Sequence, residues 1–320
     1  MISDFLPRLE GRSLYFKLVV LLLLIAVFLL LSMVIGIVIA LPFFGLDAVM
    51  NLTNMDSLNG HRTVVLLKFF QMVNQLGVFI LPALAFAYLY NRKPIKYLHL
   101  SDKIQLPHLF LSVLLIIVSL PAINRMVVWN EQMDLPDFFN GIENWMKSSE
   151  DQTQMLTDAF LNVTSVVGLF GNLIVIALLA AVGEELLFRG VILRILYTNL
   201  KNVHLAVFIS AVLFSALHMQ FYGFLPRMVL GMLFGYIFIW SGTLWLPIVL
   251  HFIFNGISVV AAFLYNKGMI STDVDSFGTS SNDNVVYGSF IASVLLLFII
   301  YWRRIISIKK EEISDDISSL

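Results

Sequence analysis

The segment Gly183-Glu-Glu-Leu-Leu-Phe-Arg-Gly190 places three charged side chains, Glu184, Glu185 and Arg189, inside a long apolar run. At the centre of a membrane helix, each such residue costs about 2.5–3.5 kcal/mol. Three of them within six residues therefore require either mutual neutralisation or a function. The apolar sequence on both sides predicts a membrane scaffold built around this segment.

The composition is typical of a helical membrane protein. Of the 320 residues, 59% are hydrophobic and 13% are charged, and the mean hydropathy is +0.89, whereas globular chains average about 45–50% apolar residues. The net charge of -1 gives no reason to propose a nucleic-acid partner. Because the sequence contains no cysteine, disulfides, thiol nucleophiles and thiolate metal sites are excluded.

At about 20 residues per crossing, the apolar runs predict an all-α polytopic membrane protein with about eight transmembrane helices. The first run exceeds the apolar core of a signal peptide, about 7–15 residues, and no small-residue cleavage site follows it, so we interpret it as a retained span. No sequence period indicates internal repeats. The predicted spans are 18–41, 63–90, 107–129, 168–194, 203–220, 224–241, 243–265 and 285–303.

The positive charges predict the orientation of the chain. One side consists of the residues before the first span, the second and fourth connections and the tail, together with Arg189, Arg194 and Arg303 in the adjoining parts of the fourth and eighth spans. This side gathers 14 of the 20 lysines and arginines. The connection between the third and fourth spans is acidic instead. Since lysine and arginine concentrate on the cytoplasmic side, both termini are expected to be cytoplasmic, in a multi-pass protein of the plasma (inner) membrane.

The chain divides into five predicted parts. N-terminal membrane helices occupy 1–136, and an amphipathic helix at 137–164 either lies on the outer membrane interface or caps the bundle. The membrane core that carries the charged segment covers 165–265. An outer loop and the last span follow at 266–303, and a cytoplasmic tail at 304–320, which is expected to be disordered from Lys309.

Two histidines and an asparagine, His218, His251 and Asn255, also lie inside apolar sequence, whereas the other four histidines fall at predicted span ends. Counted from a predicted turn at 198–202, Glu184 and His218 both lie about 21–24 Å along their helices. Counted from a turn at 241–242, His251 and Asn255 lie about 14 and 20 Å along theirs. Helix tilt absorbs this mismatch, so the four side chains can share one cavity in the membrane.

Spacing separates the two carboxylates. Glu185 and Arg189 are four residues apart, so they share a helix face and can pair. Glu184 is rotated about 100° from that face, which leaves one carboxylate free for chemistry. A single glutamate–arginine pair or a single buried histidine is as often structural as functional, but the combination at matching depth indicates a functional site.

These residues resemble the CAAX protease and bacteriocin-processing family of intramembrane proteases (CPBP, also called Abi). The resemblance covers roughly residues 165–265 and rests on three motifs that occur in order, each in a predicted span. The motifs are Glu-Glu-x-x-x-Arg at Glu184, Glu185 and Arg189, Phe-x-x-x-His at Phe214 and His218, and His-x-x-x-Asn at His251 and Asn255.

The resemblance implies an endopeptidase that hydrolyses membrane-embedded or lipid-anchored peptides, with such a peptide or protein and the lipid bilayer as its partners. Glu184 is the candidate general base that activates a water, which His218 would orient. His251 and Asn255 would donate hydrogen bonds to the developing oxyanion. Glu185 and Arg189 would hold the first carboxylate in place.

A metal cofactor stays an open alternative. Glu184, His218 and His251 match the ligand set of a catalytic zinc site, and the family is often labelled metalloprotease. The His-Glu-x-x-His spacing of the usual zinc hydrolases is absent, however, and zinc binding by Glu184 would leave Glu185 as the remaining base.

Two other function classes also stay open. The first is a non-catalytic membrane regulator or bacteriocin-immunity protein that binds a membrane partner. The second is a small-solute or proton-coupled transporter, because glutamates and histidines also build proton relays. Transporters often contain paired repeats with broken helices, and no such pairing occurs in this sequence.

Overall fold

The computed structural model describes residues 9–50, 60–133, 136–272 and 278–318, with side chains as far as 306. Every regular element in these ranges is helical, which confirms the predicted all-α class. Within them, seven helical stretches are long and apolar enough to cross a membrane. They are Leu14–Phe44 (α1), His61–Asn91 (α3, η3 and α4), Leu106–Glu131 (α6), Val166–Leu200 (α8 to α10), Phe224–Ser241 (α12), Trp245–Asn266 (α13) and Asp283–Ile306 in α14.

The predicted fifth span is shorter than expected. Helix α11 covers Val203–Ala216, and its 14 residues extend about 21 Å, less than the roughly 30 Å of a bilayer core. A left-handed backbone at Met219 (φ 54°) prevents the helix from continuing to residue 220. The Ser215 hydroxyl also donates to the Phe224 carbonyl at 2.7 Å, tying the turn to the start of α12. His218 therefore lies on a turn at the end of α11 and not within a helix.

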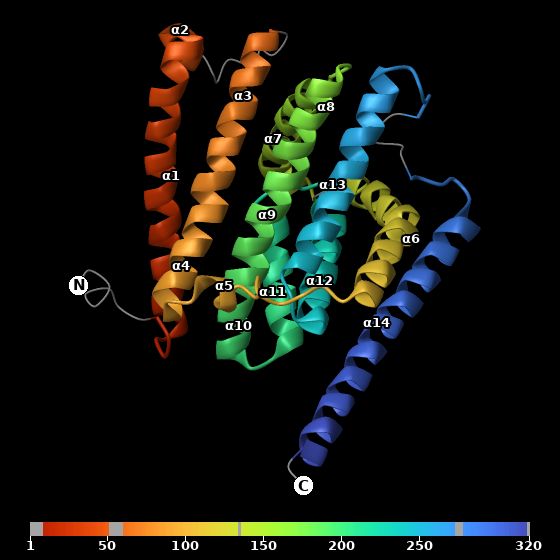
Figure 1. Cartoon of the computed structure of the whole chain (residues 1–320). Coiled ribbons are helices and arrows are strands. Elements are labelled where there is room, and N and C mark those ends of the chain that lie inside the picture. The colour runs from red at the N-terminus through yellow and green to blue at the C-terminus, as the bar shows by residue number, and fades with distance from the viewer. Residues whose placement is uncertain (1–8, 51–59, 134–135, 273–277, 319–320) are drawn as a thin grey trace, which may run out of the picture.

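The helices form a bundle around the segment that carries the charged motif (Figure 1). α1 and the α3–α4 helix stand together on one side, and α6 and α14 pack against each other on the other. Between them lie α8 to α13, with α11 packed against α12. The long helix Val166–Leu200 is continuous. Between α8 and α10 it contains η5 (Leu173–Leu178), α9 (Leu179–Glu185) and η6 (Leu186–Ile192).

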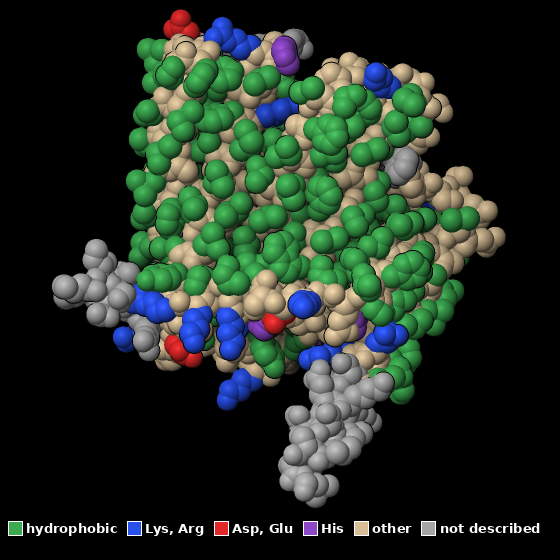
Figure 2. All heavy atoms as spheres, in the orientation of Figure 1, with side chains coloured by type: hydrophobic (Ala, Val, Ile, Leu, Met, Phe, Trp, Pro, Cys, Tyr) green, Lys and Arg blue, Asp and Glu red, His purple; other side chains and the backbone are tan. Residues whose placement is uncertain are grey.

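Apolar side chains cover the outside of the bundle (Figure 2). Lysine and arginine side chains gather along the lower edge, where α1 begins and α10 (Leu193–Leu200) ends. α1 exposes most of its aliphatic side chains, with Leu22, Leu30 and Val38 all more than 60% exposed. Such a surface is stable in lipid and not in water, so the chain is a multi-pass membrane protein.

The tail differs from its prediction. Helix α14 (Asp283–Ser318) continues through residues 309–318, so the disorder expected from Lys309 is wrong for this structure. The run Lys309-Lys-Glu-Glu312 consists of residues with high intrinsic helix propensity, which lets the helix extend beyond the apolar span.

Gly183 and Gly190 allow neighbouring segments to approach the charged segment closely. A Cβ atom on Gly183 would lie 3.0 Å from both the Phe79 Cβ and the Gln75 Oε1, and one on Gly190 would lie 2.7 Å from a Leu98 methyl. Helix η3 (Gln75–Ile80) therefore packs directly on the backbone beside Glu184. Small residues permit this kind of contact in membrane helices.

Gly183→Val is expected to lower the free energy of unfolding by about 1–3 kcal/mol, the usual cost of overpacking. The matched control is Gly171→Val on the same long helix, because a Cβ there meets no atom within 4 Å. Reversible unfolding in detergent, followed by circular dichroism, measures both variants. Equal stability of the two would contradict the close contact with η3.

Candidate active site

All eight residues from Gly183 to Gly190 are buried. Glu184 and Glu185 end α9, and Arg189 lies in η6, a π-helical stretch. π-helical turns are rare and often occur at functional sites. The charged segment thus sits in the interior of the bundle, where each charge needs a partner.

Arg189 finds its partners within the protein. Its Nη1 donates to Glu185 Oε1 at 2.6 Å, and its Nη2 donates to the Gly231 carbonyl at 3.0 Å. The guanidinium also lies 4.6 Å from the Phe214 ring centre. Both charged residues are at most 1% exposed, so the predicted pairing is present as a buried, hydrogen-bonded ion pair.

The same carboxylate orients His251. Glu185 Oε1 lies 2.8 Å from His251 Nδ1, and a carboxylate oxygen can only accept, so Nδ1 carries the proton. The Phe234 ring stacks on the imidazole at 5.4 Å between ring centres. His251 is thereby fixed with its Nε2 directed at Glu184, 3.8 Å from Glu184 Oε2.

His218 is oriented in the same way by the backbone. Its Nδ1 lies 2.8 Å from the Phe214 carbonyl oxygen, which also can only accept a hydrogen bond. Its Nε2 therefore carries the lone pair in the neutral ring, and it lies 3.8 Å from Glu184 Oε2. The Phe214 ring meets the imidazole edge-on at 5.0 Å.

Three hydrogen-bond acceptors thus converge without a donor between them. Glu184 Oε2 is buried and has no hydrogen-bond partner in the described structure. A separation of 3.8 Å is too long for a direct hydrogen bond, but one water molecule can bond to both atoms across it. A water in this position would supply the two missing protons, and it would do so beside a carboxylate that can act as a base.

The turn that carries His218 is clamped from two sides. Asn130 of α6 donates to the Phe221 carbonyl at 2.9 Å and accepts from the Leu225 amide at 2.8 Å. Helix α7 (Asn140–Leu161) adds the Ser149 hydroxyl, which donates to the Met219 carbonyl at 3.0 Å, and the Trp145 ring, which packs on Phe221 at 5.2 Å. These contacts favour the capping interpretation of the amphipathic segment.

Asn255 lies one turn after His251 on α13 and bonds to a neighbouring helix. Its Nδ2 donates to the Ile176 carbonyl at 3.3 Å, on η5. The structure therefore brings together Glu184, His218 and His251 around one point and Glu185 and Arg189 behind it. The amide of Asn255 is bonded to a helix backbone nearby.

Some groups that pack around the site residues lie outside the three sequence motifs. The Gly231 carbonyl has no signal in the sequence, because any residue supplies a carbonyl. Gln75 is 3% exposed, and its Oε1 lacks a partner in the described structure while lying close to Gly183. Gln75 could have been identified as an amide side chain inside the second predicted span. Asn130, an amide at the end of the third predicted span, could have been identified in the same way.

The zinc alternative can be tested against this geometry. The donor types suit zinc, but among the residues that the structure describes no group of three His, Cys, Asp or Glu side chains is arranged to hold a metal ion. Tetrahedral ligands about 2.0–2.2 Å from zinc lie roughly 3.4 Å from one another, whereas both Nε2 atoms lie 3.8 Å from Glu184 Oε2. As they are arranged, these side chains do not fit a zinc ion.

Comparison with known proteins agrees with the placement of the site. Residues 166–257 match the family described as "Type II CAAX prenyl endopeptidase Rce1-like". A Bacillus subtilis (strain 168) protein, named "Uncharacterized protein YpbD", is 29% identical over 90 residues, which are 27% of this chain and 43% of that protein. The chain thus matches less than half of that relative's length. No solved structure matches the chain.

Proposed function

We propose that this membrane protein, whose residues 166–257 match the family described as Rce1-like type II CAAX prenyl endopeptidases, hydrolyses peptide bonds of membrane-embedded or lipid-anchored peptides through a water activated by Glu184. The observation that carries the proposal is the unpartnered, buried Glu184 Oε2 with two imidazole Nε2 atoms 3.8 Å away. A carboxylate so placed can accept a proton from a water held between these groups.

In the proposed reaction, Glu184 accepts a proton from the water while the water oxygen bonds to the scissile carbonyl carbon. The carbonyl becomes a tetrahedral oxyanion, its C–N bond then breaks, and the proton held by Glu184 passes to the leaving nitrogen. His218 accepts a hydrogen bond from the water and orients it. Glu185 and Arg189 fix His251 and the helix, so these two residues act through position.

The oxyanion needs donors, and we propose His251 and Asn255 for this role. Asn255 must exchange the Ile176 carbonyl for the substrate, and its present bond of 3.3 Å is longer than the usual 2.9–3.0 Å. His251 donates to the oxyanion when its Nε2 carries a proton, while its Nδ1 stays bonded to Glu185. Each donor of this type contributes roughly 3–4 kcal/mol to transition-state stabilisation in other hydrolases.

We propose that both termini are cytoplasmic and that the chain resides in the plasma membrane. The start of α1 and the end of α14 lie at the same side of the bundle, which is also the basic edge (Figures 1 and 2). Lysine and arginine favour the cytoplasmic side. Cysteine-labelling of residues introduced near Arg12 and near Gly242 tests this orientation, because both positions should be shielded from a membrane-impermeant reagent.

Quantitative membrane proteomics tests the proposed function. Cells that carry the wild type are compared with cells that carry Glu184→Gln or His218→Ala at equal expression. Uncleaved membrane precursors are expected to accumulate in both variants, with the matching fragments present in the wild type alone. An unchanged peptide profile in both variants would reject catalysis and favour a regulator that acts by binding.

Metal removal distinguishes a zinc-dependent mechanism from one in which Glu184 activates the water without a metal. Because the three donors do not fit zinc as arranged, prolonged treatment with EDTA or 1,10-phenanthroline is expected to leave cleavage within about twofold of the untreated rate. Elemental analysis of the purified protein should find less than stoichiometric zinc. Complete loss of cleavage, restored by added zinc, would contradict the water-only mechanism and leave hydrolysis itself supported.

A further inference from the structure

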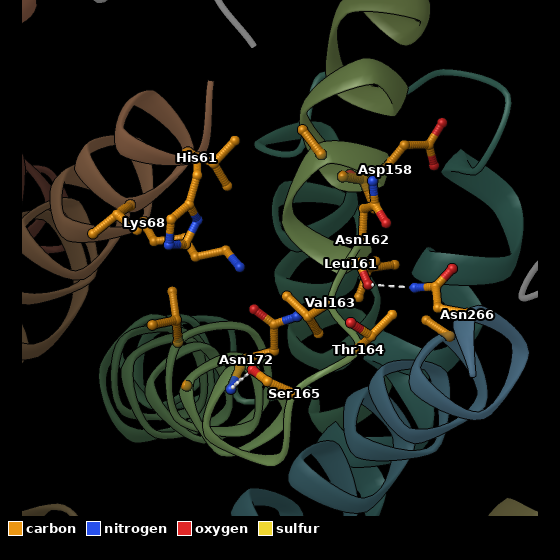
Figure 3. A pocket seen from close by; sticks show the side chains of 18 of the residues that line it. His61, Lys68, Asp158, Leu161, Asn162, Val163, Thr164, Ser165, Asn172 and Asn266 are labelled. Carbon is orange, nitrogen blue, oxygen red and sulfur yellow. Dashed lines mark hydrogen bonds between the residues drawn. The ribbon is translucent and has the colours of Figure 1, made fainter. Parts of the chain in front are cut away.

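A large cavity, seen from close by in Figure 3, is lined by the parts of α3 and α8 that lie at the end of the bundle opposite the basic edge in Figures 1 and 2. It has a volume of about 1780 Å³ and lies between α3 (His61–Asn74), the end of α7, α8 (Val166–Asn172) with η5, and α13. Its deepest residues on the long helix, Ile174 and Val175, precede Glu184 by about 13–15 Å along the helix. The cavity is therefore separate from the catalytic groups.

Two polar side chains line this cavity, the half-buried Lys68 and the buried Asn172. The Lys68 ammonium donates to the Phe160 carbonyl at 2.8 Å, and no carboxylate of the described residues lies within ion-pair distance of it. Asn172 is 1% exposed, and its Nδ2 donates to the same carbonyl at 2.8 Å while its Oδ1 has no partner in the described structure. The half-buried ammonium also lies 5.6 Å from the Phe160 ring centre, and it has no carboxylate partner among the described residues. Beside the unpaired Asn172 Oδ1, it can accommodate an anionic ligand that also carries a hydrogen-bond donor.

The lining changes character along the cavity. Met72, Ile174 and Val175 line its end toward the middle of the bundle, and Lys68 and Asn172 lie about one turn nearer the outside. The rim contains the backbone of residues 161–165 and the polar Asn266. An occupant should therefore place an apolar part toward the membrane centre and a polar, anionic part toward the membrane surface.

We propose that this cavity binds an anionic phospholipid, with its phosphate on Lys68, a headgroup hydroxyl donating to Asn172 Oδ1, and an acyl chain over Met72, Ile174 and Val175. Lys68 lies seven residues from the start of α3, about 10 Å along it. If α3 begins near the outer boundary of the headgroup region, the ammonium lies close to the level at which lipid headgroups meet acyl chains.

A peptide could also fill a cavity of this size, but the observations favour the lipid. The order from Lys68 and Asn172 to the apolar floor is that of a lipid in the same leaflet, and the apolar Val64 and Val65 also line the cavity outside Lys68. The one acidic residue among the labelled lining side chains, Asp158, accepts from Gln154 at 3.0 Å and points away from Lys68 in Figure 3. It therefore does not compete for the ammonium.

Native mass spectrometry of the full chain in detergent, titrated with phosphatidylglycerol or with phosphatidylcholine of the same acyl chains, tests the proposal. The wild type is expected to bind phosphatidylglycerol about tenfold more tightly than phosphatidylcholine, a difference that corresponds to one charge-assisted hydrogen bond. Lys68→Met should bind the two lipids equally. Lys68→Arg should retain the preference for phosphatidylglycerol. Lys267→Met, which removes a charge outside the cavity lining, is the matched control.

Asn172→Asp provides a second variant, because a carboxylate beside Lys68 should exclude the phosphate without changing side-chain volume. Equal phosphatidylglycerol binding by the wild type, Lys68→Met and Asn172→Asp would overturn the proposal. Competition by millimolar inorganic phosphate, with no dependence on acyl chains, would reduce the site to a phosphate site and also overturn it. A photoreactive residue at Met72 should capture lipid, and capture of a peptide instead would assign the cavity to substrate.

Discussion

Arg189→Met is expected to lower the free energy of unfolding by about 3–5 kcal/mol, the cost of removing one partner from a buried ion pair. The substitution leaves the Glu185 carboxyl group in the bundle interior, with His251 as its remaining hydrogen-bond partner among the described residues. It also leaves the Gly231 carbonyl without the guanidinium. Reversible unfolding in mixed micelles measures the change.

The matched control is Arg125→Met, which breaks the pair between Arg125 and Asp283 at the same kind of distance, 2.7 Å. That pair is partly solvated, with Asp283 62% exposed, so the expected cost is at most about 1 kcal/mol. The double variant Glu185→Gln with Arg189→Met should cost less than the sum of the two single variants. Equal effects of Arg189→Met and Arg125→Met would show that the buried pair contributes no more to stability than the solvated one.

Glu184→Gln is expected to lower the cleavage rate by about 10²–10⁴-fold, the contribution of a general base. Its stability should not fall, because Glu184 Oε2 has no hydrogen-bond partner to lose in the described structure. The rate is measured on a precursor identified by proteomics, with protein reconstituted in vesicles. A lower cleavage rate with unchanged stability would show that the Glu184 carboxylate takes part in the reaction and does not hold the structure together.

Glu185→Gln is the informative comparison for this variant, since it should lower both the rate and the stability by weakening the bonds to Arg189 and His251. Asp151→Asn, which alters an exposed carboxylate on α7, should change neither the rate nor the stability. A Glu184→Gln protein with the wild-type rate would remove Glu184 from the mechanism. A Glu184→Gln protein that unfolds readily would assign Glu184 to structure.

The sequence predicted the scaffold well because hydrophobic length is a strong signal in membranes. Each predicted span corresponds to a helix, and the turns at 198–202 and 241–242 occur where expected, with left-handed residues Lys201 and Gly242. The pairing of Glu185 with Arg189 followed from spacing of four residues. Depth counting also placed Glu184, His218 and His251 together.

The remaining features depend on tertiary contacts that a sequence pattern does not encode. Asn255 was expected to face the site, yet its amide bonds to a backbone carbonyl of the adjacent helix. The end of α11 before His218 is determined by the left-handed Met219 and by bonds from Ser215 and Asn130. The occupant of the large cavity depends on Lys68 and Asn172, which are more than 100 residues apart in the chain.

The π-helical stretches in the long helix determine the angular phase of its side chains. A wider turn accommodates an added residue and rotates everything after it by about 100° relative to an uninterrupted α-helix. The residues before Glu185 and those after Ile192 therefore follow two different angular registers, although the apolar sequence is continuous across them. A single-residue deletion within 186–192 would bring both halves into one register, and it would turn the helix below η6 away from its present packing while Glu184 stays in place.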